Sequence, residues 1–439
     1  MHMTKKLAIF PFILIVFVTM VSLFMGHNPT SIAANDKINT GDTAWLLTSA
    51  ALVLIMTPGL AFFYGGMVKK KNVISTMLQS FICMVIVSLI WVIFGFSLAF
   101  GNNMLGGFLG NPMTFFLMNG VLDGKPWVAA PTVPLVVFAF FQLKFAIISP
   151  ALVTGAISER VRFTSYLLFI CLFIIFIYCP LAHATWHPDG FLAKLGVLDF
   201  AGGTVVHLSA GVAALASAIY LKKRTDQEMK PARITYVLLG AGLLWFGWFG
   251  FNGGSAMGAN NLAAIALATT AVASGAAAFA WIIFDALRGK KPSAMGTSIG
   301  AVVGLVAITP AAGFVSLPHA MVIGIVASFV SNLMVELRTR TGLDDTLDVF
   351  PCHGMGGLVG MILTGVFANP GINPVAGKGL FFGETKLFFT HFFASIAIMV
   401  CVFIMSMIIL KITDLITPLR VNEEEEAVGL DITQLGESL

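Results

Sequence analysis

Charged residues are scarce in this chain of 439 residues. Asp, Glu, Lys and Arg make up only 10% of it, whereas soluble domains carry about 25%. Hydrophobic residues make up 58% of the chain, which also has 39 Phe and 44 Gly. This composition excludes a soluble enzyme. It predicts helices that contact lipid and one another, with Gly allowing close approach.

Cysteine is also rare, and no cysteine falls in a loop. The five cysteines lie in apolar segments, at Cys83, Cys171, Cys179, Cys352 and Cys401. A disulfide framework or a zinc module is therefore not expected, and we interpret the five as small packing residues. The formal net charge of +4 is small, so no nucleic-acid partner is expected.

Long apolar runs dominate the chain instead. Residues 7–24 form an apolar run after two lysines and before small residues at Ser31 and Ala33. This pattern is typical of a cleavable signal peptide, which we assign to residues 1–34, and a retained signal anchor is the alternative. Eleven further apolar stretches follow, at residues 45–67, 74–100, 133–156, 165–184, 200–221, 234–251, 262–284, 294–309, 320–335, 349–367 and 387–412.

The sequence thus predicts an all-α integral membrane protein with eleven transmembrane helices. A span needs about 20 apolar residues, so the membrane domain covers residues 43–418 and leaves a short tail at 419–439. No segment is long enough for a large soluble domain, and the function is expected inside the bundle.

Basic residues occur in alternate loops. They follow the first, third, fifth, seventh, ninth and last spans, as Lys69, Lys70 and Lys71; Arg160 and Arg162; Lys222, Lys223, Arg224, Lys230 and Arg233; Arg288, Lys290 and Lys291; Arg338 and Arg340; and Arg420. The intervening loops have almost none. Because cytoplasmic loops collect Lys and Arg, we expect the mature N-terminus outside and the C-terminal tail inside.

Motifs also recur five spans apart. LAFFYGG ends the first span and WFGFNGG the sixth, while LDFAGGTVVH opens the fifth and LDVFPCHG the tenth. An odd number of spans per half inverts one half relative to the other in the membrane. We therefore expect two inverted five-helix repeats, at about 43–221 and 231–368, followed by a final helix at 387–412.

Each repeat places an Asp at a helix start and a His a few residues later. The pairs are Asp199 with His207 and Asp348 with His353. The Asp can cap free backbone N–H groups and complement the helix dipole. Because the halves are inverted, the two imidazoles are expected to meet near the middle of the bilayer.

The two histidines are the strongest candidates for function, since ionisable residues inside spans are rare. We expect neutral imidazoles, because burial disfavours the charged form and two charged rings would repel. His207 and His353 would share a hydrogen bond and offer their outer nitrogens to a pore. One alternative is a bridge between helices with no further role.

A metal centre is the other alternative, but no third ligand stands at helical spacing beside either histidine, and no metal or cofactor is predicted. No GxSxG or HExxH motif occurs, so the chain is not expected to be an enzyme.

Three further residues fall at the expected outer side, Phe145, Trp186 and Ser255. Aromatic residues there are usually interfacial anchors. The alternative is a small cage, in which aromatic faces attract a cation and a hydroxyl accepts its hydrogen bond. Asp199 is interpreted as a structural cap, which can also favour a nearby cation. Composition alone leaves these alternatives open.

Six motifs resemble the Amt/Mep ammonium transporter family. They are MTPGLAFFYGG at 56–66, FFQLKFA at 140–146, ISERVRF at 157–163, DFAGGTVVH at 199–207, WFGFNGGS at 248–255 and LDDTLDVFPCHG at 343–354. They occur in family order from the first span to the tail. Trp186 and Ser255 favour the Amt branch over the related Rhesus proteins, which lack both.

The resemblance implies a homotrimer in the cell membrane, with a pore in each protomer. It implies an outer ammonium site at Phe145, Trp186 and Ser255, supported by Asp199. It also implies a gate of Phe145 and Phe251 above a pore pair of His207 and His353.

The implied function is ammonium transport. Ammonium, or methylammonium, would lose its proton and cross as ammonia with net charge transfer, and potassium would be excluded. The alternatives are an ammonium sensor with little transport and an electroneutral Rhesus-like gas channel.

Two features depart from the family pattern. Lys144 stands beside Phe145, where relatives commonly have a small or apolar residue, and it can affect the outer vestibule, snorkel or face a neighbouring protomer. The usual His-Gly-Glu ending of the tail appears as Leu435, Gly436 and Glu437. The family implies a tail on the inner trimer surface and docking of a PII-type signal protein. A solvated acidic run at 423–426 is the plainer alternative.

Overall fold

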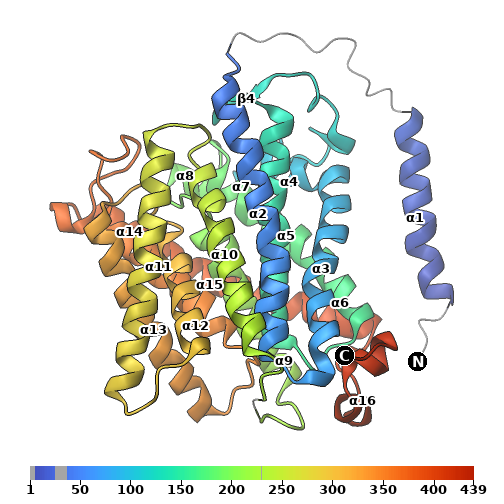
Figure 1. The fold of residues 1–439 in the computed structure, drawn as a ribbon. Helices are drawn as coiled ribbons and strands as arrows, with labels where there is room; N and C mark the ends of the chain where they lie inside the picture. Colours follow the sequence, from blue (N-terminus) through green and yellow to red (C-terminus); the bar gives the residue numbers. More distant parts are fainter. Residues whose placement is uncertain (1–4, 25–36, 229) are drawn as a thin grey trace.

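The computed structural model describes residues 5–24, 37–228 and 230–439 and is mostly helical (Figure 1). The α-helices are α1 (Lys5–Phe24), α2 (Thr40–Met67), α3 (Val73–Ile90), α4 (Phe96–Phe100), α5 (Leu135–Ile157), α6 (Phe163–Phe173), α7 (Cys179–Trp186), α8 (Phe191–Lys194), α9 (Ser209–Leu221), α10 (Ile234–Gly254), α11 (Asn261–Leu287), α12 (Ala294–Ile308), α13 (Leu317–Thr341), α14 (Gly356–Phe367), α15 (Lys386–Ile416) and α16 (Glu423–Val428). Two small antiparallel pairs, β1 (Asn103–Met104) with β2 (Leu109–Gly110) and β3 (Pro126–Trp127) with β4 (Ala130–Pro134), lie between α4 and α5.

Ten helical segments in the described residues are long and apolar enough to cross a membrane. They are Thr40–Met67, Lys70–Phe100, Leu135–Ile157, Phe163–Lys194, Gly203–Leu221, Ile234–Gly254, Asn261–Leu287, Leu317–Thr341, Phe350–Phe367 and Lys386–Ile416. The prediction of an all-α, multi-pass membrane protein is confirmed. The expected span at 294–309 is α12, a shorter apolar helix of 15 residues, so the total of eleven stays a prediction.

The predicted signal segment is described only in part. Its apolar run forms α1, while Ser31 and Ala33 lie outside the described residues. The signal peptide therefore stays a prediction.

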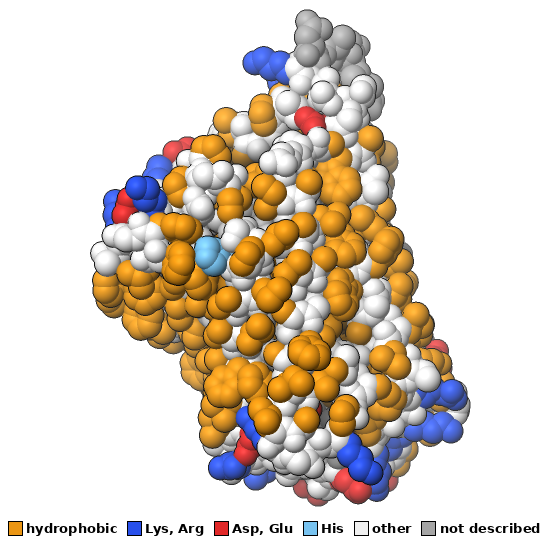
Figure 2. Space-filling model, turned by 60° about the vertical axis from the view of Figure 1, so that its left-hand side comes forward, with side chains coloured by type: hydrophobic (Ala, Val, Ile, Leu, Met, Phe, Trp, Pro, Cys, Tyr) orange, Lys and Arg blue, Asp and Glu red, His pale blue; other side chains and the backbone are white. Residues whose placement is uncertain are grey.

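The surface agrees with a lipid environment. Figure 2 shows hydrophobic side chains over the middle of one face, with charged side chains gathered toward its ends. Large apolar side chains such as Phe81, Phe246 and Ile404 are about half exposed, at 52%, 53% and 53%. Soluble monomers rarely show so large an apolar patch, so this belt is the surface that contacts lipid or other chains.

Glycine allows the two halves of the chain to pack closely. The motifs that recur in sequence end α2 and α10, which lie side by side in Figure 1. A methyl group on Gly240 of α10 would collide with the backbone of Phe63 in α2. Small residues at such crossings are how membrane helices approach one another, so this contact joins the first half of the chain to the second.

The tail packs against the lower end of the bundle in Figure 1, where α16 lies. The Asp431 carboxylate, 1% exposed, accepts hydrogen bonds from the backbone N–H groups of Ile74 (3.0 Å) and Ser75 (2.7 Å) at the start of α3. Glu425 pairs with Arg162 at 3.1 Å, and Glu426 is buried. The tail therefore shares contacts with the bundle, and only part of the acidic run is solvated.

A buried cluster of charges stands above the tail. Arg224 binds Glu159 at 2.6 Å and Asp344 at 2.9 Å, and Arg160 donates to Thr346. Burial alone would raise the pKa of Asp344, but hydrogen bonds from Arg224 and the charge of Arg160 lower it below its usual value. This cluster ties the loops after α5, α9 and α13 together.

Candidate functional site

The helix that carries His207 begins at an aspartate cap. Asp199 Oδ1 accepts hydrogen bonds from the backbone N–H groups of Gly202 (2.8 Å) and Gly203 (2.6 Å). Oδ2 accepts hydrogen bonds from the Thr204 backbone N–H (2.7 Å) and the Thr204 hydroxyl O–H (2.5 Å). Free N–H groups at a helix start need such acceptors. The predicted capping role of Asp199 is therefore seen directly in the geometry.

The helix that carries His353 also has an aspartate cap, but it is not the predicted residue. Asp345 accepts the backbone N–H groups of Val349 (3.1 Å) and Phe350 (2.7 Å). Asp348 instead pairs with Arg338 at 2.6 Å and has a positive φ of 58°. The expectation that Asp348 caps this helix is wrong, because its backbone is left-handed and sits outside the helical turn.

Both histidines occupy π-helical turns. His207 lies in Gly203–Leu208 and His353 in Phe350–Met355. Such turns are rare and are frequent at functional sites, since the widened register re-aims a side chain. The same local device thus recurs in both halves.

The two imidazoles meet, as the sequence predicts. Their Nδ1 atoms are 3.4 Å apart, and their ring centroids are 5.5 Å apart with planes 20° from parallel. His207 is 1% exposed and His353 is 3% exposed. His207 Nε2 is buried without a hydrogen-bond partner among the described residues. The pair shares its inner nitrogens and leaves outer nitrogens for a small polar guest.

A close glycine contact allows this meeting. Gly211 lies one turn after His207, and Gly354 follows His353 directly. A methyl group on Gly211 would collide with the backbone of Gly354. The two histidine helices therefore cross with almost no side-chain volume between them.

Two phenylalanine rings close the path above the histidines. The Phe145 and Phe251 centroids are 4.1 Å apart, and Phe251 lies 5.9 Å from the His207 ring. Both rings are buried, at 1% and 0% exposure. The residues predicted as a gate therefore form a continuous aromatic barrier.

A cavity of about 180 Å³ opens above these rings, toward the upper end of Figure 1. Nine described residues line it: Phe100, Ala129, Phe138, Gln142, Phe145, Trp186, Phe200, Ser255 and Met257. It brings together all three residues that the sequence predicts for the outer site.

Hydrogen bonds fix the walls of this upper cavity. Trp186 Nε1 donates to the Asp199 carbonyl oxygen at 3.0 Å, so the indole ring is held against the cap. The Ser255 hydroxyl donates to the Phe251 carbonyl oxygen at 2.8 Å, which leaves its lone pairs as acceptors. The walls are thus aromatic faces and at least one acceptor, which suits a small cation.

Below the phenylalanines the path narrows sharply. Two cavities of about 10 Å³ each follow, one next to Phe251 and both histidines, the other next to His353 and Cys352. Each has room for about one molecule the size of water. Met67, Ile299 and Leu347 are shared with a wider cavity of about 540 Å³ at the lower end.

The wide lower cavity is lined by charged groups. They include Asp285, Lys290, Glu336, Arg340 and Asp348. The path therefore runs from an aromatic cavity through an apolar constriction to a polar one.

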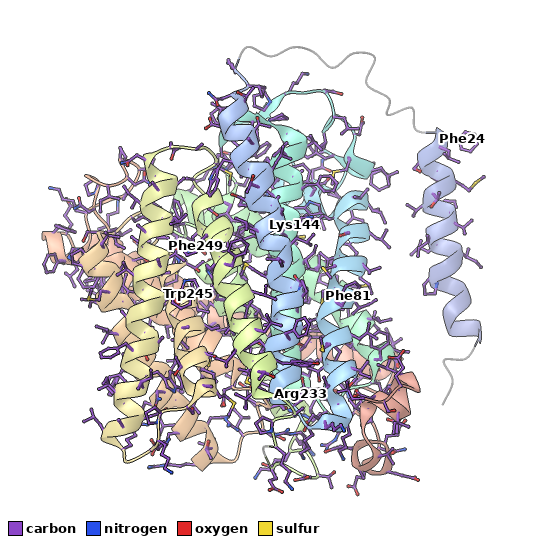
Figure 3. All side chains as sticks on the ribbon, viewed as in Figure 1. Phe24, Phe81, Lys144, Arg233, Trp245 and Phe249 are labelled. Carbon is purple, nitrogen blue, oxygen red and sulfur yellow. The ribbon has the colours of Figure 1, made fainter. Side chains whose placement is uncertain are left out.

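Lys144 stands apart from this path. Its Nζ lies 5.9 Å from the centroid of the Phe140 ring on the same helix, and it is not among the lining residues of the upper cavity (Figure 3). Of the alternatives weighed from the sequence, an effect inside the upper cavity has the least geometric support.

One contact of His207 was not predicted from the sequence. The Trp248 ring stacks on His207 with centroids 5.2 Å apart, and its Nε1 donates to Thr309 at 2.8 Å. Trp248 lies one helical turn before Phe251 in a motif already singled out, and that spacing was the available signal. In the described residues no group of three or more His, Cys, Asp or Glu is placed to hold a metal ion.

Comparisons with known proteins agree with this arrangement. Residues 44–439 match the model of the Ammonium Transporter Family. An ammonium transporter of Bacillus subtilis is 45% identical over 401 residues, covering 90% of this chain and 98% of the relative. The crystal structure of Candida albicans Mep2 is 33% identical, with a TM-score of 0.84 over 92% of this chain and 91% of that one. A sensor Amt protein is 27% identical, with a TM-score of 0.81 over 90% and 98%.

These relatives also settle the broad class. The family and its named members are transporters, which confirms that the chain is not an enzyme. With its apolar helices, the chain is a multi-pass protein of the cell membrane. From the match over nearly its whole length, the chain belongs to the ammonium transporter family.

Proposed function

We propose that this ammonium transporter takes up ammonium at the upper cavity, removes its proton there, and conducts ammonia past Phe145 and Phe251 along the two histidines. The proton follows along the imidazole pair, which gives net charge transfer. The observation that carries the proposal is the 3.4 Å approach of His207 and His353, directly beneath the two phenylalanine rings. Two polar rings in an apolar constriction can hydrogen-bond a small molecule in transit.

The proposed orientation puts the upper end outside the cell. Support comes from basic loops that converge on the lower end. Lys69 pairs with Asp226 of the basic loop after α9, Arg162 pairs with the tail, and Arg340 lines the lower cavity. Cytoplasmic loops are the ones that collect Lys and Arg.

Ammonium suits the upper cavity for electrostatic reasons. Trp186 and Phe145 meet edge to face, with centroids 5.9 Å apart, so the cavity has two differently oriented ring faces. A desolvated cation gains about 2 kcal/mol from such a face. Ser255 supplies a hydrogen-bond acceptor for one N–H of the ion.

Deprotonation is the less costly route through the constriction. Burying a bare cation costs several kcal/mol even after relaxation. Removing a proton at pH 7 costs about 3 kcal/mol for an amine with a pKa of about 9, at about 1.36 kcal/mol per unit. Ammonia can then donate to and accept from the imidazoles.

Potassium is excluded under this proposal. The ion has no proton to lose, so it must cross as a charge through cavities of about 10 Å³ with apolar walls. It also donates no hydrogen bonds to the histidines. The same constriction that passes ammonia therefore rejects a cation of similar charge.

Assembly and processing complete the proposal. We propose eleven transmembrane helices in two inverted repeats, a cleaved signal at residues 1–34, a homotrimer, and a PII-type partner at the lower face. The exposed apolar belt supports association in the membrane. N-terminal sequencing of the mature protein tests the cleaved signal, and native mass spectrometry tests the homotrimer.

The test of the mechanism is a current measurement on purified protein in liposomes on a solid-supported membrane. Ammonium jumps are compared with potassium jumps for wild type and His207→Ala. We expect an ammonium-only current that the substitution abolishes. An internal pH change without current would favour the neutral gas channel, and neither signal would favour a sensor.

A further inference from the structure

The upper cavity has few groups that can hydrogen-bond a guest. Four of its described lining side chains are phenylalanine rings, those of Phe100, Phe138, Phe145 and Phe200. The side chains of Ala129 and Met257 have no strong hydrogen-bond acceptor. The Trp186 N–H is already used by the Asp199 carbonyl. This leaves Ser255 and Gln142.

Gln142 is built into the wall of the cavity by its helix. Phe138, Gln142 and Phe145 stand at positions i, i+4 and i+7 of α5, so they share one face. All three line the upper cavity. Gln142 is only 5% exposed, and its position is therefore fixed by packing rather than by solvent.

The Gln142 amide is polar, buried and unsatisfied. Its Oε1 has no hydrogen-bond partner among the described residues. An unpaired buried acceptor destabilises the fold, and such a group needs a reason to be present. The terminal torsion of glutamine is broad, so rotation of the amide can present either atom to the cavity.

We propose that Gln142 is a second hydrogen-bond acceptor for ammonium in the upper cavity, beside Ser255. This inference rests on the proposed function and adds a ligand to its recruitment site. Ammonium has four N–H donors and no acceptor, so it needs oxygen lone pairs, which an amide carbonyl provides. The aromatic rings attract the positive charge of ammonium but do not orient its N–H groups. The two side-chain oxygens, of Ser255 and Gln142, accept hydrogen bonds from those N–H groups.

The test compares three variants in the liposome assay, with half-saturating ammonium and maximal current as readouts. Gln142→Met keeps the length of the side chain and removes the acceptor. Gln142→Glu keeps an acceptor and adds charge. The matched control is Gln79→Met, because Gln79 is 2% exposed and its Oε1 is also buried without a partner, but it lies on α3 and lines no described cavity of the path.

We expect Gln142→Met to raise the half-saturating concentration about tenfold or more, as for a lost hydrogen bond to a charged group. Gln142→Glu should leave it unchanged or lower it, and Gln79→Met should leave it unchanged. A thermal unfolding scan of each variant checks folding. If Gln142→Met cannot be purified, Gln142→Glu carries the test alone and must not weaken binding.

Two results would overturn the proposal. Equal half-saturation in wild type and Gln142→Met would show that the amide does not touch the ion. Equal weakening by Met and Glu would indicate packing rather than hydrogen bonding. Either result with an intact wild-type ammonium current defeats this inference alone, whereas no wild-type current at all defeats the proposed function with it.

Discussion

The two histidine half-sites use one backbone device in opposite surroundings. Each has an aspartate cap eight residues before the histidine, Asp199 before His207 and Asp345 before His353, and each histidine sits in a π-helical turn. Asp199 borders an aromatic cavity of about 180 Å³, while Asp345 borders a cluster of charges near a cavity of about 540 Å³.

Placement of the imidazoles and the chemistry of their surroundings are separate features of the fold. The repeated device places the imidazoles, and it works whether its surroundings are aromatic or ionic. Under the proposed function the two ends of the path do different work, with cation selection at one end and release into water at the other, which accounts for the different surroundings.

Removing the histidines singly and together tests whether the two half-sites act as one unit. We expect His207→Ala and His353→Ala each to lower ammonium current at least about 100-fold, because each ring needs the other to bridge the constriction. The double variant should lose no more than either single variant. Additive losses, measured as currents in the same liposomes, would show that the rings act independently.

Substituting the aspartates at the two helix starts shows how much each one contributes to the free energy of unfolding. Asp199→Ala removes an acceptor of four hydrogen bonds and should cost about 3 kcal/mol or more of unfolding free energy. Asp345→Ala removes two and should cost about 2 kcal/mol. Asp348→Ala breaks an ion pair whose side chains are 18% and 17% exposed, and about 1 kcal/mol is expected.

Denaturation of the purified variants in detergent measures this order. A larger loss for Asp348→Ala than for Asp345→Ala would return the capping role to the residue that the sequence suggested.

The aromatic surroundings of the first half-site can be tested without touching its cap side chain. Trp186→Leu removes one ring face from the upper cavity and should raise half-saturating ammonium about thirtyfold, in line with about 2 kcal/mol for a cation–π contact with a desolvated ion. Maximal current should change little. Unchanged half-saturation would mean that the ring is a membrane anchor.

The charged surroundings of the second half-site predict a pH effect. The pKa of Asp344 is lowered in the folded chain by its arginine partners. Its contribution to stability is therefore fully present above its unfolded pKa of about 3.9 and is lost as the pH falls through the folded value. Wild type should lose its advantage in unfolding temperature over Asp344→Asn below about pH 4. A constant difference down to pH 2 would contradict this pairing.

Apolar runs and motifs predicted much of this molecule. The runs located the long helices within a few residues, because lipid demands about 20 apolar residues for each crossing. The recurrence of Asp and His predicted that His207 and His353 meet. The resemblance supplied Phe145, Trp186 and Ser255 as neighbours, which composition alone could not distinguish from interfacial anchors.

Other features depend on how the chain turns in space. Three aspartates lie within LDDTLD, and the left-handed backbone at Asp348 decides that Asp345 reaches the helix start. The spacing of eight residues was present in the sequence, but the nearer Asp348 hid it. The π-helical turns depend on hydrogen-bond register, which no local propensity encodes.

The two small cavities beside the histidines have a consequence for the energy balance of the cell. Each holds about one water-sized molecule, and their walls are mostly side chains without hydrogen-bonding groups. An unbroken file of water would relay protons down the membrane potential and drain it. Short, separate compartments interrupt such a relay, so under the proposed function a proton crosses only together with an ammonia molecule and the path does not drain the proton gradient when ammonium is absent.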